Sequence, residues 1–247
     1  MKWGHCLSTK NRLDIEMVRQ GLVKTRSQAE SYIKLGKVLV ESRTITKPGY
    51  FISPDVRIQL NQAEQYVGRA GLKLASIVSD FKLDFKNKIV LDVGSSTGGF
   101  TDYAIKHGAR LVYAVDVGTD QLHPSLRSNS KINLYEQTDI RDFRPEKMPD
   151  IVVIDVSFIS LRDILPHIAK IIAKNTQVVA MVKPQFEAGK ALQTKGVLKN
   201  DSIRRQVLKD FEIWIKNRFV IVQKADSKVA GQKGNVERFY LLAKVVI

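Results

Sequence analysis

Residues 90–100 read Val90-Leu91-Asp92-Val93-Gly94-Ser95-Ser96-Thr97-Gly98-Gly99-Phe100. The stretch opens with an apolar run that favours a buried β-strand, passes through a glycine-rich turn and enters a helical pattern. A strand, a glycine-rich turn and a helix make up the first βα unit of an open α/β sheet, where ligands bind at the carboxyl ends of the strands. The stretch therefore predicts the fold class and the edge of the sheet that holds a ligand.

The regions that follow continue this alternation. Short apolar runs rich in β-branched residues lie at 88–93, 110–115, 132–136, 151–155 and 176–182. Helical patterns lie between most of them, at 98–106, 119–126 and 161–174. Apolar strands that alternate with helices predict a Rossmann-like α/β fold, with a mostly parallel sheet covered on both faces.

The C-terminal region adds a helix and two strands to this sheet. A helical pattern at 201–216 leads to strand-like runs at 219–223 and 238–247. Because no helix separates the last two runs, we expect them to pair antiparallel as a hairpin at the edge of the sheet. The complete sheet then has seven strands.

The region before residue 61 has a different texture. Two amphipathic helical patterns end near Gly21 and Gly36, and short strand-like runs follow at 38–40, 51–52 and 56–58. Two helices and a small sheet in about fifty residues form a module of marginal stability on its own. We therefore expect a leader at 1–10, a small α+β domain at 11–60, a linker at 61–67 and the α/β domain at 68–247.

The formal net charge of +15 favours association with polyanions, with nucleic acid ahead of an anionic membrane surface. We expect a set of basic side chains to face RNA phosphates, five in the small domain and one at the start of the larger domain. These residues are Arg12, Arg19, Lys24, Arg26, Lys34 and Arg69. The alternative is that they form only a solvated basic face. A single cysteine, Cys6, excludes an intrachain disulfide and fits a reducing, cytoplasmic compartment.

Carboxylates accompany the glycine-rich turn. The dinucleotide pattern G-x-G-x-x-G is not met because residue 96 is Ser96, and Asp92 before Gly94 would repel a pyrophosphate. A carboxylate suits a ligand with an ammonium and a sulfonium centre. Asp116, 22 residues beyond Gly94, is placed to accept both hydroxyls of a ribose, and Asp139 to reach an adenine amino group. The pattern predicts S-adenosylmethionine, with a nicotinamide cofactor as the alternative.

The predicted cofactor-binding set contains the turn and the residues that follow the next strands. It comprises Asp92, Gly94, Ser95, Ser96, Thr97, Gly98, Gly99, Phe100, Asp116, Val117, Asp139, Ile140 and Asp155. A structural interpretation remains open, in which the glycines only make a tight turn and the aspartates only cap helices.

Four charged residues are candidates for catalysis. Asp155 closes the fourth strand-like run, Lys183 follows the fifth, Lys73 lies in the helix before the first, and Glu237 opens the last. Attack of a ribose 2′-hydroxyl on a methyl sulfonium needs a base, and a lysine serves only if burial or a second cation lowers its pKa. We predict Lys183 as the base, Lys73 as the second cation, Asp155 as the group that orients the amine, and Glu237 as a partner of Lys73 or the ribose. The alternative is surface charges and a structural salt bridge.

The sequence lacks the residues that other kinds of methylation, or catalysis by a metal, would require. Methylation at pyrimidine carbon 5 needs a cysteine nucleophile, and Cys6 lies outside the α/β domain. Methylation of exocyclic amines usually places Asn/Asp-Pro-Pro-aromatic after the fourth strand, where this chain has Asp155-Val156-Ser157-Phe158. His107, His123 and His167 show no metal-ligand spacing, so we expect no metal.

Taken together, several motifs resemble one known family. Residues 66–74, 92–100, 155–161 and 183–187 (Lys-Pro-Gln-Phe-Glu) are similar to FtsJ-like methyltransferases. Residues 12–60 resemble an S4-like RNA-binding domain at Arg26-Ser27-Gln28-Ala29-Glu30, Gly36-Lys37-Val38 and Lys47-Pro48-Gly49. The chain thus resembles the TlyA family, which includes proteins named hemolysin A and ribosomal RNA 2′-O-methyltransferases.

This resemblance implies a Lys-Asp-Lys-Glu tetrad at Lys73, Asp155, Lys183 and Glu237, and methylation of cytidine ribose in ribosomal RNA with S-adenosylmethionine. Two features depart from the family pattern. Gly68 and Ala70 stand where the family usually reads Ser-Arg-Gly-Gly, and the polar leader at 1–10 is atypical. Ribosomal RNA or ribosomal subunits are the expected partners.

Two rival functions remain at this stage. A cytolysin needs a spanning helix or a closable amphipathic hairpin, and the sequence shows neither, so we expect no stable membrane insertion. A non-catalytic RNA-binding assembly factor that keeps the cofactor pocket is the other rival.

Overall fold

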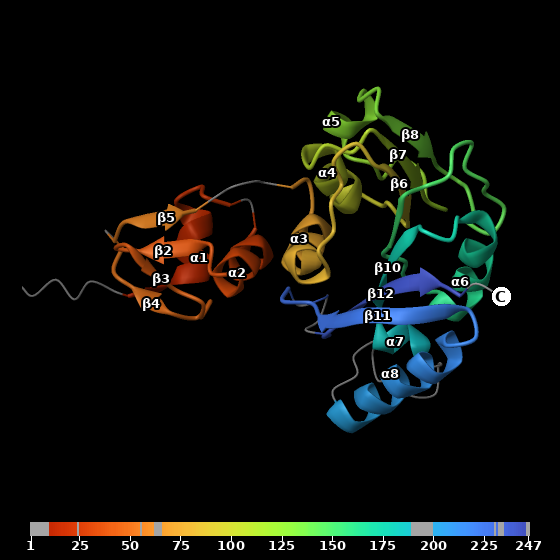
Figure 1. The fold of residues 1–247 in the computed structure, drawn as a ribbon. Coiled ribbons are helices and arrows are strands. Elements are labelled where there is room, and N and C mark those ends of the chain that lie inside the picture. The colour runs from red at the N-terminus through yellow and green to blue at the C-terminus, as the bar shows by residue number, and fades with distance from the viewer. Residues whose placement is uncertain are drawn as a thin grey trace, which may run out of the picture. The chain divides into compact units, whose positions relative to one another are not determined.

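The computed structural model describes residues 10–23, 25–54, 56–61, 66–188, 200–229, 231 and 235–245. The chain divides into two compact units, Met1–Gln65 and Tyr66–Ile247 (Figure 1).

The N-terminal unit is a small α+β structure. Its elements are β1 (Asn11–Arg12), α1 (Leu13–Arg19), α2 (Arg26–Lys34), β2 (Val38–Val40), β3 (Arg43–Thr44), β4 (Phe51–Ile52) and β5 (Ile58–Leu60). The strands form two antiparallel sheets, β1-β4 and β3-β2-β5, and α1 packs against α2. The predicted helices and the strand at 38–40 are present, while the run predicted at 56–58 pairs only from Ile58 onward.

Apolar residues four apart explain this packing. Leu13 and Met17 on α1, and Ala29 and Ile33 on α2, are fully buried, so each helix turns one stripe toward the shared core. Thr25 caps α2 by accepting a hydrogen bond from a backbone N–H of the first turn at 3.2 Å.

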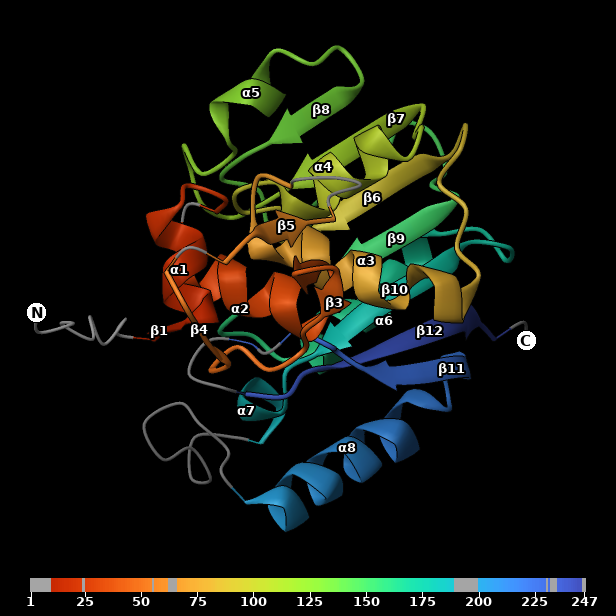
Figure 2. The same ribbon diagram turned by 90° about the vertical axis from the view of Figure 1, so that its left-hand side faces the viewer.

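The C-terminal unit is a seven-stranded α/β structure. Its elements are α3 (Arg69–Phe81), β6 (Ile89–Val93), α4 (Gly99–Lys106), β7 (Leu111–Val115), α5 (Pro124–Arg127), β8 (Ile132–Tyr135), β9 (Ile151–Ile154), α6 (Leu161–Ile171), β10 (Gln177–Val182), α7 (Pro184–Glu187), α8 (Asp201–Ile215), β11 (Phe219–Asp226) and β12 (Arg238–Lys244). The strand order is β11-β12-β10-β9-β6-β7-β8, which Figure 2 shows from bottom to top.

Five neighbouring strands, β10, β9, β6, β7 and β8, run parallel, and β12 pairs antiparallel with both β10 and β11. The predicted mostly parallel sheet and its C-terminal hairpin are confirmed. The chain leaves β6 toward β7 on one side and later returns to β9 on the other. This reversal leaves a crevice at the carboxyl end of β6, the position where ligands bind in open α/β sheets.

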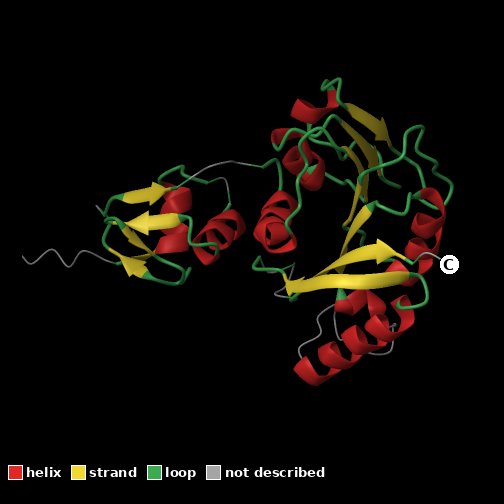
Figure 3. Ribbon diagram, in the orientation of Figure 1, coloured by secondary structure: helices red, strands yellow, loops and turns green. Residues whose placement is uncertain are grey.

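Helices cover both faces of the sheet (Figure 3). Alternate residues of each buried strand face opposite layers: Leu91 and Val93 pack with α6 and α8, whereas Val90 packs with α3 and α4. This alternation decides which side chains at the strand ends share a face.

One predicted helix is shorter than expected, and one observed helix was not predicted. The helix predicted at 119–126 is reduced to the four residues of α5, because Asp120 adopts a left-handed φ of +53° and Pro124 begins the helix at its first position. The short helix α7 was not predicted, and it too begins with a proline, Pro184.

Candidate active site

A cavity of about 320 Å³ opens at the carboxyl ends of β6, β7 and β9. Its wall combines predicted cofactor residues with neighbours that sequence reasoning missed. The predicted ones are Gly94, Ser96, Asp116, Val117, Asp139, Ile140 and Asp155. The missed ones are Val93, Val115, Gln121, Thr138, Val156, Ser157, Phe158, Ile159 and Ile164. The missed residues are mostly next to predicted ones in the sequence, so extending each motif by one or two positions would have found many of them.

Asp116 ties the ends of β6 and β7 together. One carboxylate oxygen accepts the N–H of Ser96 at 2.8 Å, and the other accepts the N–H of Gly118 at 2.7 Å. Gln121 lies over this turn and accepts a hydrogen bond from the Ser96 hydroxyl at 3.1 Å. Each carboxylate oxygen can accept a further hydrogen bond. Asp116 therefore presents a fixed pair of acceptors to the cavity.

Asp139 presents a second carboxylate, which is held by Arg141. The guanidinium donates to both oxygens at 3.0 and 2.6 Å, and the backbone N–H of Arg141 donates at 2.9 Å. These hydrogen bonds hold the pKa of Asp139 below its usual value. Asp139 is therefore a fixed anion at the cavity wall.

The glycine-rich turn only partly lines the cavity. Ser95, Thr97, Gly98, Gly99 and Phe100 are not among the described residues that form its wall. A Cβ at Gly98 would lie 2.5 Å from Leu126, and one at Gly99 would lie 2.8 Å from Ala70. The close packing of these two glycines therefore leaves no room for a side chain at either position.

Asp92 is not among the described residues that line the cavity. It is fully buried on β6, and it accepts a hydrogen bond from the hydroxyl of Thr101 on α4 at 2.6 Å. Burial raises the pKa of Asp92 to about 7, although the bond from Thr101 opposes this shift. The structure therefore places Asp92 against α4.

The four predicted catalytic residues form two ion pairs. The amine of Lys183 lies 2.6 Å from a carboxylate oxygen of Asp155 and donates to the hydroxyl of Ser157 at 2.9 Å. The amine of Lys73 lies 2.5 Å from a carboxylate oxygen of Glu237. None of the four side chains is more than 14% exposed. All four are therefore largely shielded from water.

The strand alternation explains why these residues gather. Asp155 and Lys183 each lie two residues beyond a side chain of the α3–α4 core, and Glu237 lies two residues before another, Phe239. Lys73 projects from α3, which covers the same face. The β10–β12 ladder ends at Val182 opposite Arg238, so Lys183 and Glu237 occupy the next positions of the same register. The two ion pairs thus lie at one edge and on one face of the sheet.

Glycines also set the position of Lys73. A Cβ at Gly71 would lie 2.9 Å from the carbonyl oxygen of Gly99 and 2.6 Å from Tyr66. Only glycine allows α3 to approach the start of α4 this closely. Half a turn later, α3 carries Lys73 to its partner Glu237.

Three of the arginines predicted to bind RNA are engaged with carboxylates of the same unit. Arg12 and Arg26 each lie 2.8 Å from Asp14, and Arg19 lies 2.6 Å from Glu16.

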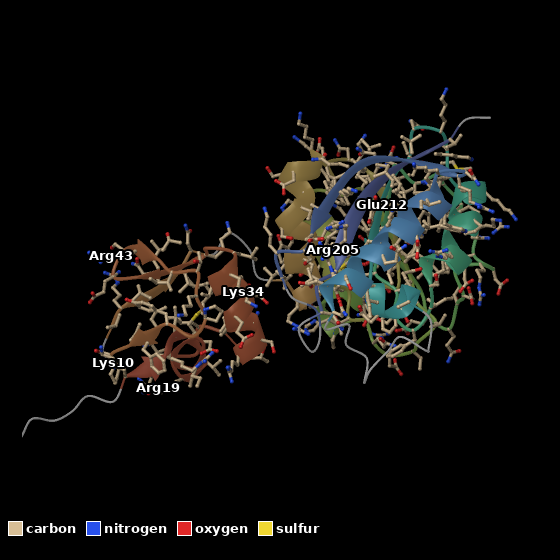
Figure 4. All side chains as sticks on the ribbon, turned by 90° about the horizontal axis from the view of Figure 1, so that it is seen from below. Lys10, Arg19, Lys34, Arg43, Arg205 and Glu212 are labelled. Atoms are coloured by element: carbon tan, nitrogen blue, oxygen red, sulfur yellow. The ribbon has the colours of Figure 1, made fainter. Side chains whose placement is uncertain are left out.

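The remaining predicted RNA-binding residues differ in their surroundings. Lys34 is exposed at the end of α2, and Figure 4 shows it apart from Arg19. Arg69, in the C-terminal unit, is half-buried at the first residue of α3. Lys24 lies outside the described residues.

The strand order and the cavity define a methyltransferase fold of the type that uses S-adenosylmethionine. The model of the FtsJ-like methyltransferase family matches residues 66–244, and that of the S4 domain matches residues 11–58. The chain therefore belongs to the TlyA family, in which an S4 domain precedes an FtsJ-like methyltransferase domain.

Individual relatives agree with this assignment. The 23S rRNA (cytidine-2′-O)-methyltransferase TlyA of Campylobacter jejuni is 41% identical over 74% of this chain and 72% of its own. Hemolysin A of Brachyspira hyodysenteriae is 37% identical over 92% of this chain and 97% of its own. The solved structure of a candidate hemolysin from Streptococcus thermophilus is 39% identical, covers 96% of this chain and 90% of its own, and has a TM-score of 0.70.

The name hemolysin makes the membrane alternative relevant. Among the described residues, no helix is both long enough and apolar enough to cross a bilayer.

Proposed function

We propose that this protein transfers a methyl group from S-adenosylmethionine to the 2′-hydroxyl of a cytidine in ribosomal RNA, in the cytoplasm. The observation that carries the proposal is the buried amine of Lys183, held by Asp155 and Ser157, two residues that also line the cavity. The name of the Campylobacter jejuni relative supports cytidine and ribosomal RNA as the substrate.

The cavity residues fit S-adenosylmethionine. A volume of about 320 Å³ is in the range of small-molecule sites. Asp116 suits the two ribose hydroxyls because its oxygens are already oriented by Ser96 and Gly118. Asp139 suits the adenine amino group, and Val117 and Ile140 supply apolar surface beside it. When bound, this cofactor supplies a methyl group activated by a sulfonium.

Lys183 is the general base in this proposal. A neutral lysine amine has two N–H bonds and one lone pair. Ser157 accepts one N–H bond and a carboxylate oxygen of Asp155 lies 2.6 Å from the amine, so both hold it while the lone pair is left for the substrate 2′-hydroxyl. Lys183 would take the hydroxyl proton while the methyl group passes from the sulfonium to the ribose oxygen and the sulfur leaves as a neutral thioether. The ion pair of Lys73 with Glu237 would orient the target ribose.

The rim of the cavity suits an unpaired nucleotide. Phe158 is 92% exposed, adopts a left-handed φ of +66° and lies 5.2 Å from the ring of Phe186. RNA-binding proteins recognise unstacked bases largely by stacking them on aromatic side chains. We assign Phe158 to contact with the target nucleotide.

The test is transfer of radiolabelled methyl groups to ribosomal subunits from a strain that lacks this protein. We expect label in 2′-O-methylcytidine with the wild-type chain, and Lys183→Met to lower the rate about 100-fold or more, since a general base contributes factors of about 10² to 10⁴. Lys228→Met, which removes an exposed amine paired with Asp80, is the matched control with no expected loss. Absence of label on any RNA with the wild-type chain would disprove the proposal.

The rival functions give different results. A cytolysin would release dye from vesicles without RNA or methyl donor. An assembly factor without catalysis would keep its cellular role in the Lys183→Met strain.

A further inference from the structure

The segments that follow β9 and β10 lie against each other at matched positions. Lys183 contacts Asp155 and Ser157, and the Phe186 ring lies 5.2 Å from that of Phe158. The last contact in this series is made by Glu187 at the end of α7. The two segments, 155–161 and 183–187, are therefore joined from the strand ends to the start of α6.

Glu187 makes this last contact with a buried carboxylate. Its side chain is 1% exposed, and its two oxygens accept hydrogen bonds from the Ser160 hydroxyl at 2.6 Å and the Leu161 N–H at 2.7 Å. Burial raises the pKa of Glu187, although these hydrogen bonds oppose the shift. The Leu161 N–H is one of the first-turn donors that a helix leaves without an internal partner. Glu187 therefore satisfies the N-terminus of α6 from a different segment.

We propose that Glu187 is a positioning residue for methyl transfer, and that its carboxylate fixes the segment carrying Lys183 against the segment carrying Asp155 and Ser157. The inference rests on the proposed function of Lys183 as the base. Its own content is the coupling between the start of α6 and the Lys183 amine. Glu187 is not among the described residues that line the cavity, and in this proposal it takes no part in proton transfer.

The short path from Glu187 to Lys183 makes this coupling strong. Lys183 is the N-cap of α7, Glu187 is the last residue of the same helix, and Pro184 fixes φ between them. A shift of α7 therefore moves the Lys183 backbone directly. Misplacement of a reacting group by about 1 Å can lower a rate about 100-fold.

The first test is Glu187→Gln, which keeps the shape but removes the charge and leaves one acceptor oxygen for the two donors, the Ser160 hydroxyl and the Leu161 N–H. We expect kcat to fall about 10- to 100-fold, with the KM values for methyl donor and RNA within about twofold of wild type. In a Lys183→Met background the same substitution should cause no further loss. An equal loss in that background, or a rise of KM with unchanged kcat, would overturn the proposal.

A second readout does not depend on activity. Hydrogen–deuterium exchange of peptides covering 155–161 and 183–188 should increase in Glu187→Gln, and should stay unchanged in the control Glu212→Gln. Glu212 also accepts hydrogen bonds from side chains, Lys224 on β11 and Tyr240 on β12, so its replacement leaves the hydrogen bonds of Glu187 in place. Unchanged exchange in Glu187→Gln would overturn the positioning role even if methylation is observed. Absence of methylation by the wild-type chain would overturn the proposed function, and with it the part of Glu187 in methyl transfer, whereas the exchange experiment would still test whether Glu187 couples the two segments.

Discussion

Both units bury carboxylates beside cations, but they do so differently. In the N-terminal unit, Asp14 and Glu16 are fully buried, while the arginines that pair with them are 36 to 60% exposed. In the C-terminal unit, both partners of the pairs Lys73–Glu237 and Lys183–Asp155 are 14% exposed or less. The exposed arginines keep much of their hydration, so those pairs neutralise a buried acid at low cost.

In the lysine pairs, both partners have lost most of their hydration. Burying two charges costs several kcal/mol per ion, and apolar residues of similar volume often serve stability as well or better. Largely desolvated pairs at the ligand-binding edge of the sheet are therefore poor candidates for a stabilising role and good candidates for chemistry. Ion pairs with one exposed partner therefore stabilise the fold of the N-terminal unit, whereas ion pairs with both partners buried are candidates for the reaction.

The largest effect on methyl transfer is expected when both residues of one buried lysine pair are replaced. The double variant Lys73→Met/Glu237→Leu should lower methyl transfer about 100-fold or more, while its melting temperature stays equal to wild type or rises. Single-turnover methylation of ribosomal subunits and thermal unfolding measure the two quantities. Lys73→Met alone should destabilise by about 3 kcal/mol, because Glu237 then remains buried and unpaired. A double variant that is unstable but active would show that this lysine pair stabilises the fold and does not serve the reaction.

A smaller effect is expected for the buried acids of the N-terminal unit. Hydrogen bonds from Arg19 lower the pKa of Glu16 to about 2 from an ordinary 4.5. A depressed folded-state pKa means that this stabilisation is complete above pH 4.5 and is lost as the pH falls toward 2. Glu16→Gln should therefore destabilise α1 by about 2 kcal/mol at neutral pH, as expected for hydrogen bonds to a charged group.

Hydrogen exchange of α1 amides at several pH values measures this difference. The gap between wild type and Glu16→Gln should shrink between pH 4.5 and 2. A gap that does not change with pH would show that the charge of Glu16 is not what stabilises the helix.

The sequence predicted the strands of the C-terminal unit because buried strands require continuous apolar runs, as in Val152-Val153-Ile154. It also placed Asp155 and Lys183 at one edge, because parallel strands end together. It did not show that Asp92 faces α4, since the direction of a side chain on a fully apolar strand depends on which helix covers each face. Nor did it predict Phe158 at the rim, because its left-handed φ has no signal in a residue that is not glycine.

The surroundings of the charged residues in the N-terminal unit could not be predicted from the sequence either. The sequence suggested that Arg12, Arg19 and Arg26 face RNA, but it carried no sign that Asp14 and Glu16 would be buried beside them. Burial of these acids depends on how α1 packs against α2, which is a tertiary property. The roles of these arginines in RNA binding are therefore open to a direct test.

The smallest effect is expected on RNA binding, when Lys34 and Arg26 are replaced separately. Lys34 is exposed and has no ion pair among the described residues, whereas Arg26 pairs with Asp14 and Glu30. Lys34→Gln should weaken binding of ribosomal RNA a few-fold and reduce the slope of log K against log salt by about 1, without a change in melting temperature. Arg26→Gln should weaken binding and also destabilise the N-terminal unit, because a buried carboxylate loses one of its partners.

Fluorescence anisotropy with a ribosomal RNA fragment, measured between about 50 and 200 mM salt, gives the slope of log K against log salt. The loss of about one phosphate contact is resolved over this range of salt concentration. Glu30→Gln serves as the control for Arg26→Gln, since it removes the exposed partner and leaves the pair with Asp14 intact. If Arg26→Gln changes the slope but not the stability, its guanidinium serves RNA rather than Asp14. The exposed arginines would then serve RNA binding and not stability. Burial of both partners would no longer distinguish ion pairs that serve function from ion pairs that stabilise the fold.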